Sequence, residues 1–410
     1  MKPRNGAKYI ILVGDGMADR PIESLGGKTP LEYAHTPGMD TLAREGILGL
    51  VRTVPAGMPP GSDIANLSLM GYDPRVAFSG RAPLEALNMG ITLGPDDCAI
   101  RCNMVEIRDG IMHDFSAGHI SSEFSALVMR ELSAALDIPG IEYYPGVSYR
   151  NILVWRNYPH EGLPETTPPH DIHGARADDH LPRGEGAEML RRIMADSAEI
   201  IASSPAIAGA RGRLEGSPTS VWLWGCGRRP RMDTLESRFG LRGRTISAVD
   251  LIHGIGRAAG LSPLHVPGAT GYIDTDYAGK ARALLEALPD VNFILLHVEA
   301  PDESGHEGNL EHKLKAIEDF DKKIVGPVMD GLSKYPEYTL LVLPDHPTPL
   351  SLRTHTDEPV PFCLRSTAGW EGTPYESMHG SSFSEAAAAS TGLFVPEGHR
   401  LIELMLNRTL

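Results

Sequence analysis

Three short, uninterrupted apolar runs constrain the fold of this 410-residue chain most strongly. They span residues 9–13, 291–297 and 339–343, and each leads within a few residues to an aspartate. Runs of β-branched and aliphatic residues without polar alternation are typical of strands covered on both faces. Between them, residues 278–288 and 312–332 have the three-to-four spacing of helices. This order predicts an α/β fold with a mostly parallel sheet and helices on both faces.

The middle of the chain has a different pattern. Residues 99–107 and 150–155 are typical of shorter strands with alternating polarity, and His- and Pro-rich loops accompany them. The buried-strand pattern resumes at residues 220–225. We therefore expect a core domain formed by residues 1–100 and 215–410, and an inserted α+β domain at residues 101–214.

The charge balance argues against two classes of partner. The chain has 38 Lys and Arg against 53 Asp and Glu, a net charge of −15, which disfavours binding to nucleic acid or to an anionic membrane. No stretch approaches the ~18 apolar residues of a membrane helix, and the run at residues 9–13 is too short for a signal peptide. Four dispersed cysteines (Cys98, Cys102, Cys226, Cys363) fit a reducing compartment. We expect a cytoplasmic protein with a small-molecule substrate, and the sequence carries no sign of its oligomeric state.

Carboxylate and imidazole side chains gather where the later apolar runs end. Asp302 and His306 are four residues apart, which places them on one face of a helical turn or at the mouth of one loop. Asp345 and His346 are adjacent, and His355 follows. Such ligands without thiolates suit Mn²⁺, Zn²⁺ or Fe²⁺ rather than a structural zinc site. One such pair alone is more often a surface Asp or a packed His, so the metal hypothesis depends on their joint occurrence at strand ends.

Ser62 and Asp63 stand at the start of a predicted helix, after Pro59-Pro60-Gly61. Either side chain is a good helix cap. The same position suits a nucleophile, because a helix N-terminus stabilises bound phosphate and a divalent ion lowers the pKa of a hydroxyl. Both interpretations stay open at this point.

Eight longer motifs run nearly from end to end of the chain. They are Gly14-Asp-Gly-Met-Ala-Asp-Arg-Pro21, Gly26-Gly-Lys-Thr-Pro30, Pro60-Gly-Ser-Asp-Ile-Ala-Asn-Leu-Ser68, Gly71-Tyr-Asp-Pro74, Gly146-Val-Ser-Tyr-Arg150, Pro169-His-Asp171, Pro301-Asp-Glu-Ser-Gly-His306 and Pro344-Asp-His346. Together they resemble the archaeal-type cofactor-independent phosphoglycerate mutases of the alkaline phosphatase superfamily. The resemblance implies an alkaline-phosphatase-like α/β core with an inserted substrate domain, and 2,3-bisphosphoglycerate-independent interconversion of 3- and 2-phosphoglycerate.

The resemblance also implies a two-metal mechanism. Ser62 would attack the phosphate of 3-phosphoglycerate and become phosphoserine, and the reoriented glycerate would take the phosphoryl group back on its other hydroxyl. The metals would activate the nucleophile and neutralise charge on the transferring group. Mn²⁺ is the expected ion, with Zn²⁺, Co²⁺ or Mg²⁺ as alternatives. The implied ligands are Asp15, Ser62, Asp345 and His346 for one ion, and Asp302, His306 and His355 for the other.

The inserted domain is expected to hold the glycerate end of the substrate. Guanidinium groups suit carboxylate or phosphate oxygens because they bind two at once. The structural alternatives are that Arg101 faces water and that His119 or His170 satisfies a loop carbonyl. Retaining glycerate requires closure, so we expect a hinge near the two crossings between the domains. The candidates are Arg81, Arg101, Asn103, His119, Arg150, His170 and Asp171.

Two positions depart from the family pattern. His253 precedes Gly254 where relatives usually have Lys, and Glu299 stands where many have Lys. We keep His253 as a substrate-binding candidate, although it is charged only if a nearby anion raises its pKa. These departures favour an alternative function, that of a bacterial branch labelled proposed homoserine kinase. Such a phosphotransferase would use the same serine and metals with a different acceptor.

The glycine-rich segment at residues 254–260 offers an alternative from another class, dinucleotide binding. Its spacing departs from the usual fingerprint, and no acidic residue lies on a clear second strand about twenty residues on. A non-catalytic binding protein is also disfavoured, because candidate ligands and a nucleophile are all present.

Overall fold

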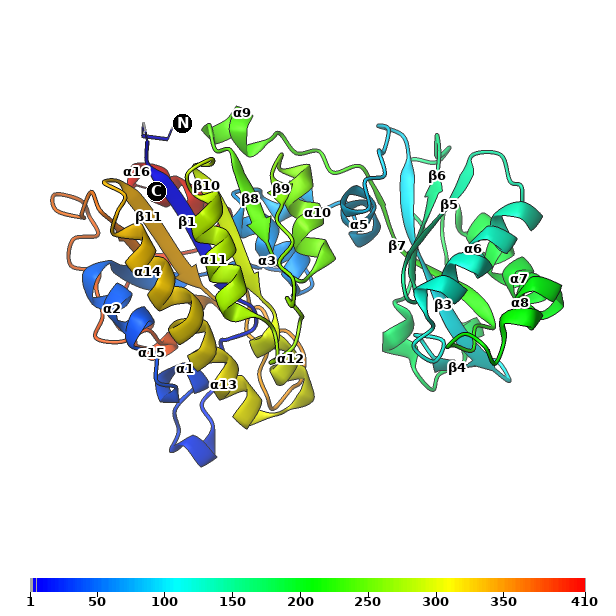
Figure 1. The fold of residues 1–410 in the computed structure, drawn as a ribbon, viewed down its shortest axis with the longest axis horizontal. Helices are drawn as coiled ribbons and strands as arrows, with labels where there is room; N and C mark the ends of the chain where they lie inside the picture. Colours follow the sequence, from blue (N-terminus) through cyan, green and yellow to red (C-terminus); the bar gives the residue numbers. More distant parts are fainter. Residues whose placement is uncertain (1–2, 5, 410) are drawn as a thin grey trace. The chain divides into compact units, whose positions relative to one another are not determined.

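The computed structural model describes residues 3–4 and 6–409. The chain divides into two compact units (Figure 1). Unit 1 consists of Met1–Phe78 and Arg231–Leu410, and unit 2 consists of Ser79–Pro230. Within the described part of the chain, every helix is too short or too polar to span a lipid bilayer.

Unit 1 is built on an eight-stranded sheet. Its strands are, in order across the sheet, β13 (Phe394–Val395), β2 (Ile47–Val51), β12 (Val360–Ser366), β11 (Tyr338–Leu343), β1 (Lys8–Gly14), β10 (Phe293–Val298), β8 (Gly243–Ile246) and β9 (Ser262–Pro263). The five strands from β11 to β9 are parallel, and β12 runs antiparallel to both β11 and β2. The three predicted apolar runs form β1, β10 and β11, which are buried almost throughout. The predicted mostly parallel sheet is confirmed.

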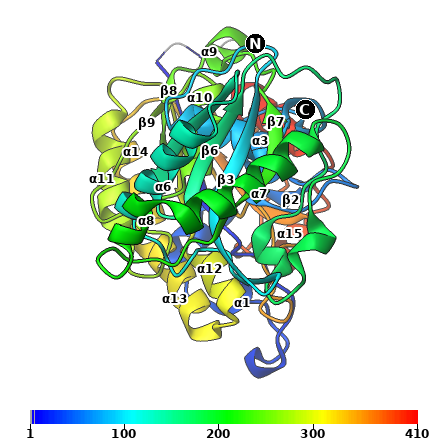
Figure 2. The same ribbon diagram turned by 90° about the vertical axis from the view of Figure 1, so that its right-hand side faces the viewer.

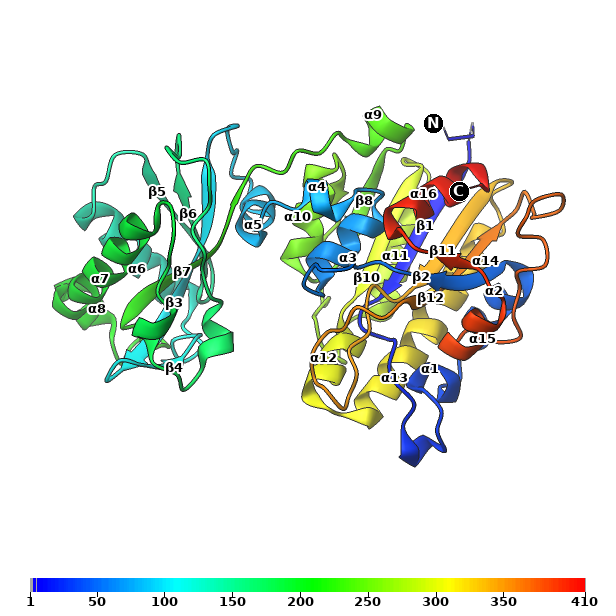
Figure 3. The same cartoon turned by 180° about the vertical axis from the view of Figure 1, so that it is seen from behind.

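Helices cover both faces of this sheet. The helices of unit 1 are α1 (Pro30–Tyr33), α2 (Pro37–Glu45), α3 (Ser62–Leu69), α4 (Pro74–Ala77), α9 (Leu235–Phe239), α10 (Asp250–Ala258), α11 (Tyr277–Ala287), α12 (Ala300–Glu307), α13 (Leu310–Phe320), α14 (Gly326–Leu332), α15 (Glu385–Ser390) and α16 (Leu401–Asn407), with short helices η1 (Glu23–Leu25), η4 (Asp321–Val325) and η5 (Gly398–Arg400). Helices α11 and α14 lie in front of the sheet in Figure 1, and α3 and α16 lie in front in the opposite view of Figure 3. Coverage of both faces explains why the central strands contain almost no polar residue.

The register of the central strands brings their carboxyl ends to one edge of the sheet. Gly14 at the end of β1 is level with Val298 of β10, and Val13 is level with Leu343 of β11. The segments that follow these three strands therefore start side by side. They carry Asp15, Asp302 and Asp345, respectively, so Asp15 lies beside segments that are 287 and 330 positions away in the sequence.

Unit 2 is an α+β unit with an antiparallel sheet. Its strands are β4 (Ile111–Asp114), β3 (Cys98–Arg108), β6 (Arg150–Trp155) and β5 (Ile141–Val147) in order, with β7 (Ser220–Arg228) also paired to β3. Its helices are α5 (Arg81–Asn88), α6 (Ser122–Ala135), α7 (Ala187–Ser203) and α8 (Pro205–Ala210), with short helices η2 (Pro169–Ile172) and η3 (Ala177–His180). Helices α6, α7 and α8 lie in front of the sheet in Figure 2. Helix α5 packs through Ala82 and Ala86 on Ala99 and Ile152, whereas their neighbours Ile100 and Leu153 join the core on the α6 and α7 side.

The expected limits of the inserted domain, residues 101–214, are too narrow. Unit 2 begins before α5 and ends after β7, and both elements lie outside the expected limits. Strand β7 pairs with β3 from Cys98 to Val105, so it is an integral strand of this sheet. Its apolar run is buried on both faces, and this is why its sequence resembles a strand of the core domain.

Candidate metal centre and substrate-binding residues

Asp15, Asp345 and His346 form the first group of candidate ligands. Their ligand atoms all lie within 4.8 Å of one another. Nε2 of His346 is 3.5 Å from Oδ1 of Asp15 and 3.7 Å from Oδ2 of Asp345. All three residues are buried. Two carboxylates and one imidazole at this spacing can surround a single cation.

Asp302, His306 and His355 form the second group. Asp302 and His306 are one turn apart on α12, so their side chains share one face of the helix. Nε2 of His306 is 3.2 Å from Oδ2 of Asp302 and 2.9 Å from Nε2 of His355. Ligand atoms of Asp302 and His355 also lie within 4.8 Å of one on His346, so the two groups adjoin each other.

Ser62 is the first residue of α3, and its hydroxyl points at the first group. Its Oγ lies 3.2 Å from Nε2 of His346 and 3.5 Å from Oδ2 of Asp15. Gly61 occupies the N-cap position, and the helix has no side-chain cap. The capping interpretation of Ser62 is therefore wrong, and the hydroxyl lies where a nucleophile beside a cation would be.

The electrostatics of this cluster fit divalent cations. Burial raises the pKa of Asp15 well above its usual value, and the charges of Asp345 and Asp302 raise it further. Burial also opposes ionisation of Asp302, but hydrogen bonds with His306 and His355 hold the pKa of Asp302 well below its usual value. Oδ1 of Asp15 is buried without a hydrogen-bond partner. A cation would satisfy this oxygen and relieve the repulsion among three buried carboxylates.

Several supporting residues were missed by sequence reasoning. Nδ2 of Asn66 donates to Oδ2 of Asp345 at 2.8 Å and to the carbonyl of Ser62 at 2.9 Å, so it ties the candidate nucleophile to a candidate ligand. Nε2 of His297 lies 3.1 Å from Oδ2 of Asp15, and burial lowers the pKa of His297 to about 4. The available signal for His297 was its place near the end of β10, level with Val13.

A backbone contact orients one imidazole of the second group. Nδ1 of His306 lies 3.0 Å from the carbonyl oxygen of Arg353. A proton on Nδ1 would be donated to that carbonyl, and Nε2 would then face Asp302 and His355 with a free lone pair. Fixing a ligating imidazole through its other nitrogen is the usual supporting interaction in protein metal sites.

Three of the predicted substrate-binding residues share one face of the sheet in unit 2. Asn103 of β3 pairs with Arg150 of β6, and Arg101 lies two residues before Asn103. The guanidinium of Arg101 is 4.1 Å from the centre of the Trp224 ring, and the indole N–H of Trp224 donates to Oδ1 of Asn103 at 3.1 Å. Nε of Arg101 lies 2.9 Å from Oε2 of Glu85.

Arg101 is buried beside Glu85, and this contradicts the alternative that it faces water. Burial lowers the pKa of Arg101 to about 10, and the charges of Arg81 and Arg150 contribute. The His170 ring lies 5.5 Å from Trp224 and 3.6 Å from Asp171. The structure thus gathers six of the seven predicted residues around this face: Arg81, Arg101, Asn103, Arg150, His170 and Asp171.

His119 and His253 behave differently from the others. His119 is exposed in a turn after β4, where its backbone N–H donates to Oγ of Ser116. His253 is buried on α10, with Nδ1 2.9 Å from Oγ1 of Thr245 and Nε2 3.1 Å from the carbonyl of Ser247. Burial lowers the pKa of His253 to about 4. The ring is therefore neutral in this structure and both nitrogens have partners within the fold, and a substrate-binding role of His253 stays a prediction.

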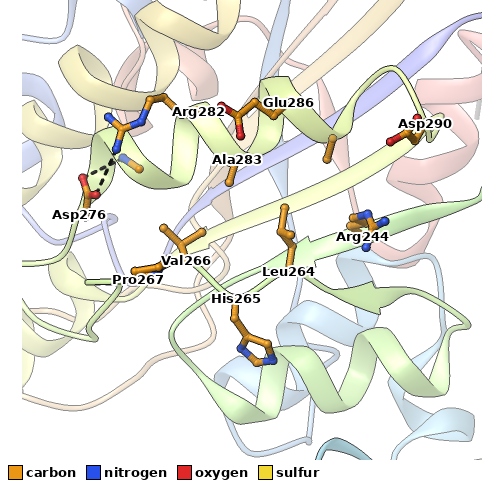
Figure 4. Close-up of a pocket in the computed structure, with 12 residues that line it drawn as sticks. Arg244, Leu264, His265, Val266, Pro267, Asp276, Arg282, Ala283, Glu286 and Asp290 are labelled. Atoms are coloured by element: carbon orange, nitrogen blue, oxygen red, sulfur yellow. Dashed lines mark hydrogen bonds and ion pairs between the residues drawn. The ribbon is translucent and has the colours of Figure 1, made fainter.

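Neither the glycine-rich segment at residues 254–260 nor the cavity in Figure 4 offers an alternative functional site. Gly254 and Gly256 lie inside α10 rather than in a turn between a strand and a helix, so they cannot cradle a dinucleotide phosphate. The cavity, of about 540 Å³, lies between α11 and the segment at β9 (Figure 4). It is lined by charges of both signs, and its Arg282 pairs with Asp276 at 3.4 Å. None of the seven candidate metal ligands lines it.

Comparisons with known proteins identify the family. The family model described as 2,3-bisphosphoglycerate-independent phosphoglycerate mutase matches residues 43–206. A protein of Geobacter sulfurreducens, named a probable 2,3-bisphosphoglycerate-independent phosphoglycerate mutase, is 51% identical and covers 98% of this chain and 100% of its own. The 2,3-bisphosphoglycerate-independent phosphoglycerate mutase of Methanothrix thermoacetophila is 49% identical, with 97% of this chain and 99% of that protein covered.

Two solved structures share the whole fold. A protein of Pyrococcus horikoshii matches with a TM-score of 0.80 at 27% identity, covering 100% of this chain and 99% of its own. The cofactor-independent phosphoglycerate mutase of Thermoplasma acidophilum matches with a TM-score of 0.66 at 23% identity, covering 98% of this chain and 99% of its own. The chain belongs to the 2,3-bisphosphoglycerate-independent phosphoglycerate mutase family.

Proposed function

We propose that the protein is a metal-dependent isomerase that interconverts 3-phosphoglycerate and 2-phosphoglycerate without 2,3-bisphosphoglycerate. The position of the Ser62 hydroxyl carries the proposal. It lies at the start of α3, 3.2 Å from His346 and 3.5 Å from Asp15, beside two adjoining groups of candidate metal ligands. Relatives that match nearly the full chain are named as such mutases, which supports the same activity.

Two divalent ions are part of the proposal. Bound ions would neutralise charge on the phosphoryl group and lower the pKa of the Ser62 hydroxyl. Oxygen and imidazole ligands fit Mn²⁺, with Zn²⁺, Co²⁺ or Mg²⁺ as alternatives. We assign Asp15, Ser62, Asp345 and His346 to one ion, and Asp302, His306 and His355 to the other.

Ser62 is the proposed nucleophile in both directions. Its Oγ forms a bond to phosphorus as the bond from phosphorus to O3 of the glycerate breaks, and the proton released by the serine is taken up on O3. In the second half, O2 of the glycerate attacks the phosphoserine, the bond to Oγ breaks, and a proton returns to Ser62. The serine therefore holds the phosphoryl group while the glycerate turns.

The face of the unit 2 sheet that carries Arg101, Asn103 and Arg150 is the proposed site for the glycerate carboxylate. The guanidinium of Arg101 packs on the ring of Trp224, and this contact leaves the side chain less freedom to lose when an anion binds. Arg150 and Arg81 add positive charge around it. We further propose that the protein works in the cytoplasm, because its four dispersed cysteines fit a reducing compartment.

The test compares Ser62→Ala with Ser68→Ala. Ser68 lies on the same helix, but its hydroxyl donates to the carbonyl of Thr53 rather than facing the candidate ligands. Each purified protein receives Mn²⁺ and 3-phosphoglycerate with enolase as the coupling enzyme, and acid-quenched samples are analysed for phosphoserine by mass spectrometry. We expect the wild type and Ser68→Ala to turn over and carry phosphoserine at residue 62, and Ser62→Ala to do neither. Full activity of Ser62→Ala would eliminate the nucleophile. A parallel assay supplies homoserine and ATP, and phosphohomoserine without mutase turnover would identify the alternative phosphotransferase.

A further inference from the structure

One buried hydroxyl, that of Thr348, contacts a member of each group of candidate metal ligands. Its Oγ1 donates a hydrogen bond to Oδ1 of Asp302 and lies 3.4 Å from Nδ1 of His346. Thr348 is 0% exposed, so water does not compete for these contacts. Building on the proposed function, we propose that Thr348 is a positioning residue that couples the two metal sites by fixing Asp302 and holding the proton of His346 on Nδ1.

The Thr348 hydroxyl has only one proton to donate, and where that proton goes determines which nitrogen of His346 is protonated. A threonine hydroxyl has one proton to donate, whereas an ionised carboxylate only accepts. The hydroxyl proton is committed to Asp302, so Oγ1 presents a lone pair to His346. Nδ1 of His346 must then carry the ring proton. The lone pair of Nε2 is left facing Ser62 and Asp15, and this is the neutral form that binds a metal ion.

The surroundings of Thr348 hold this residue closely. Nζ of Lys313, which is fully buried, donates to the carbonyl of Thr348 at 2.7 Å and to Oδ2 of Asp19 at 2.8 Å. A Cβ added to Gly16 would lie 2.6 Å from Oγ1 of Thr348, and one added to Gly305 would lie 2.6 Å from its carbonyl oxygen. The residue is therefore enclosed between two glycines and tied down by a buried ammonium group. Such close packing leaves the hydroxyl little room to move.

This arrangement predicts a coupled effect on both ions. Asp302 belongs to one proposed site and His346 belongs to the other, so removing the hydroxyl disturbs a ligand of each. A residue that merely stabilises the fold would lower the unfolding temperature without changing metal affinity. Loss of a supporting contact to a ligand typically weakens metal binding or activity by on the order of 10- to 100-fold.

The test uses three variants of the full chain. Thr348→Val removes the hydroxyl at nearly constant volume, and Thr348→Ser retains it. Thr339→Val is the matched control, because Thr339 is also buried, lies on β11 and pairs with Ser366 rather than with a ligand. Binding of Mn²⁺ is measured by titration against a competing chelator. We expect Thr348→Val to weaken both binding steps by on the order of 10- to 100-fold, and Thr348→Ser and Thr339→Val to stay within a few-fold of the wild type.

A spectroscopic measurement separates positioning from general loss of stability. In protein labelled with ¹⁵N-histidine and loaded with Zn²⁺, we expect the Nδ1 proton of His346 to exchange with solvent faster in Thr348→Val than in the wild type or Thr339→Val. Equal exchange would show that another acceptor, such as the carbonyl of Pro347, holds this proton, and would overturn the inference. Wild-type metal affinity in Thr348→Val would overturn it while leaving the proposed function intact. Failure of the wild type to bind any divalent ion would overturn both.

Discussion

His253 and Lys280 show how burial sets the charge of a side chain. His253 is buried on α10, and burial lowers its pKa to about 4 and leaves it neutral. Lys280 is also fully buried and donates to the carbonyl of His297 at 3.2 Å. Burial lowers the pKa of Lys280 to about 8, and the charge of Glu299 opposes this shift. Glu299 therefore lies in the field of a buried cation from α11.

The ionisation of His253 predicts a pH-dependent stability. The pKa of His253 is about 4 in the folded protein, and the ordinary value of 6.5 applies to the unfolded chain. The unfolded chain therefore binds the proton more tightly. The stabilisation is complete above pH 6.5 and is lost as the pH falls through 4. This difference corresponds to about 3 kcal/mol.

The measurement compares urea unfolding of the wild type and of His253→Gln between pH 7 and pH 4. The Gln amide is neutral and polar and does not titrate in this range. We expect the free energy of unfolding of the wild type to fall by about 3 kcal/mol more than that of the variant. Parallel curves for the two proteins would contradict a neutral, buried His253.

Among the secondary-structure elements, the π-helix η4 has an identifiable structural role. It separates α13 from α14 and places Asp321 against the N-terminus of α2. The two carboxylate oxygens of Asp321 accept from the N–H groups of Gly38 at 3.0 Å and Met39 at 2.6 Å. Thr36, at the N-cap of α2, makes no capping hydrogen bond of its own. Asp321 therefore acts as a helix cap supplied by a distant element.

This contact predicts a specific loss of stability. Asp321→Ala leaves two N–H groups of α2 without partners and should lower the free energy of unfolding by about 1–2 kcal/mol. Asp330→Ala on α14 is the control, because Asp330 is exposed. Thermal unfolding measured by circular dichroism distinguishes the two variants. Equal unfolding temperatures would contradict the capping role.

Sequence patterns located the elements whose burial is uniform along their length. Strands β1, β10 and β11 were predicted because both faces of each are covered, and the aspartates that follow them could then be placed at one edge. Strand β7 has the same pattern, but it was assigned to the wrong unit, because apolar residues record burial and not the neighbour that provides it. Asn66 and Thr348 left no such signal. Asn66 meets Asp345 across 279 positions of sequence, a contact that only the fold creates.

At the scale of the whole molecule, each unit has its own hydrophobic core. In unit 2, Phe124 of α6, Leu190 of α7 and Trp222 of β7 are fully or almost fully buried in one cluster. Strand β7 supplies part of this core and pairs along β3, although about 65 residues of loop and helix separate it from β6. A unit with a continuous core of this kind is expected to fold alone.

Two fragments test this division of the chain. Residues 79–230 contain α5 and β7 and should unfold cooperatively as an isolated fragment. Residues 101–214, the limits expected from sequence, lack both elements and leave the edge of β3 unpaired, so this fragment should remain unfolded or aggregate. Urea unfolding followed by tryptophan fluorescence and circular dichroism distinguishes them. Cooperative unfolding of the 101–214 fragment, without cooperative unfolding of the 79–230 fragment, would contradict the observed boundaries.

Seven side chains from distant parts of the sequence, Ser62 among them, are proposed to hold two divalent ions. Anomalous diffraction from crystals of the full chain grown with Mn²⁺ locates these ions. We expect two anomalous peaks, one among Asp15, Ser62, Asp345 and His346 and the other among Asp302, His306 and His355. Manganese bound only elsewhere, or no manganese at either group, would contradict the account.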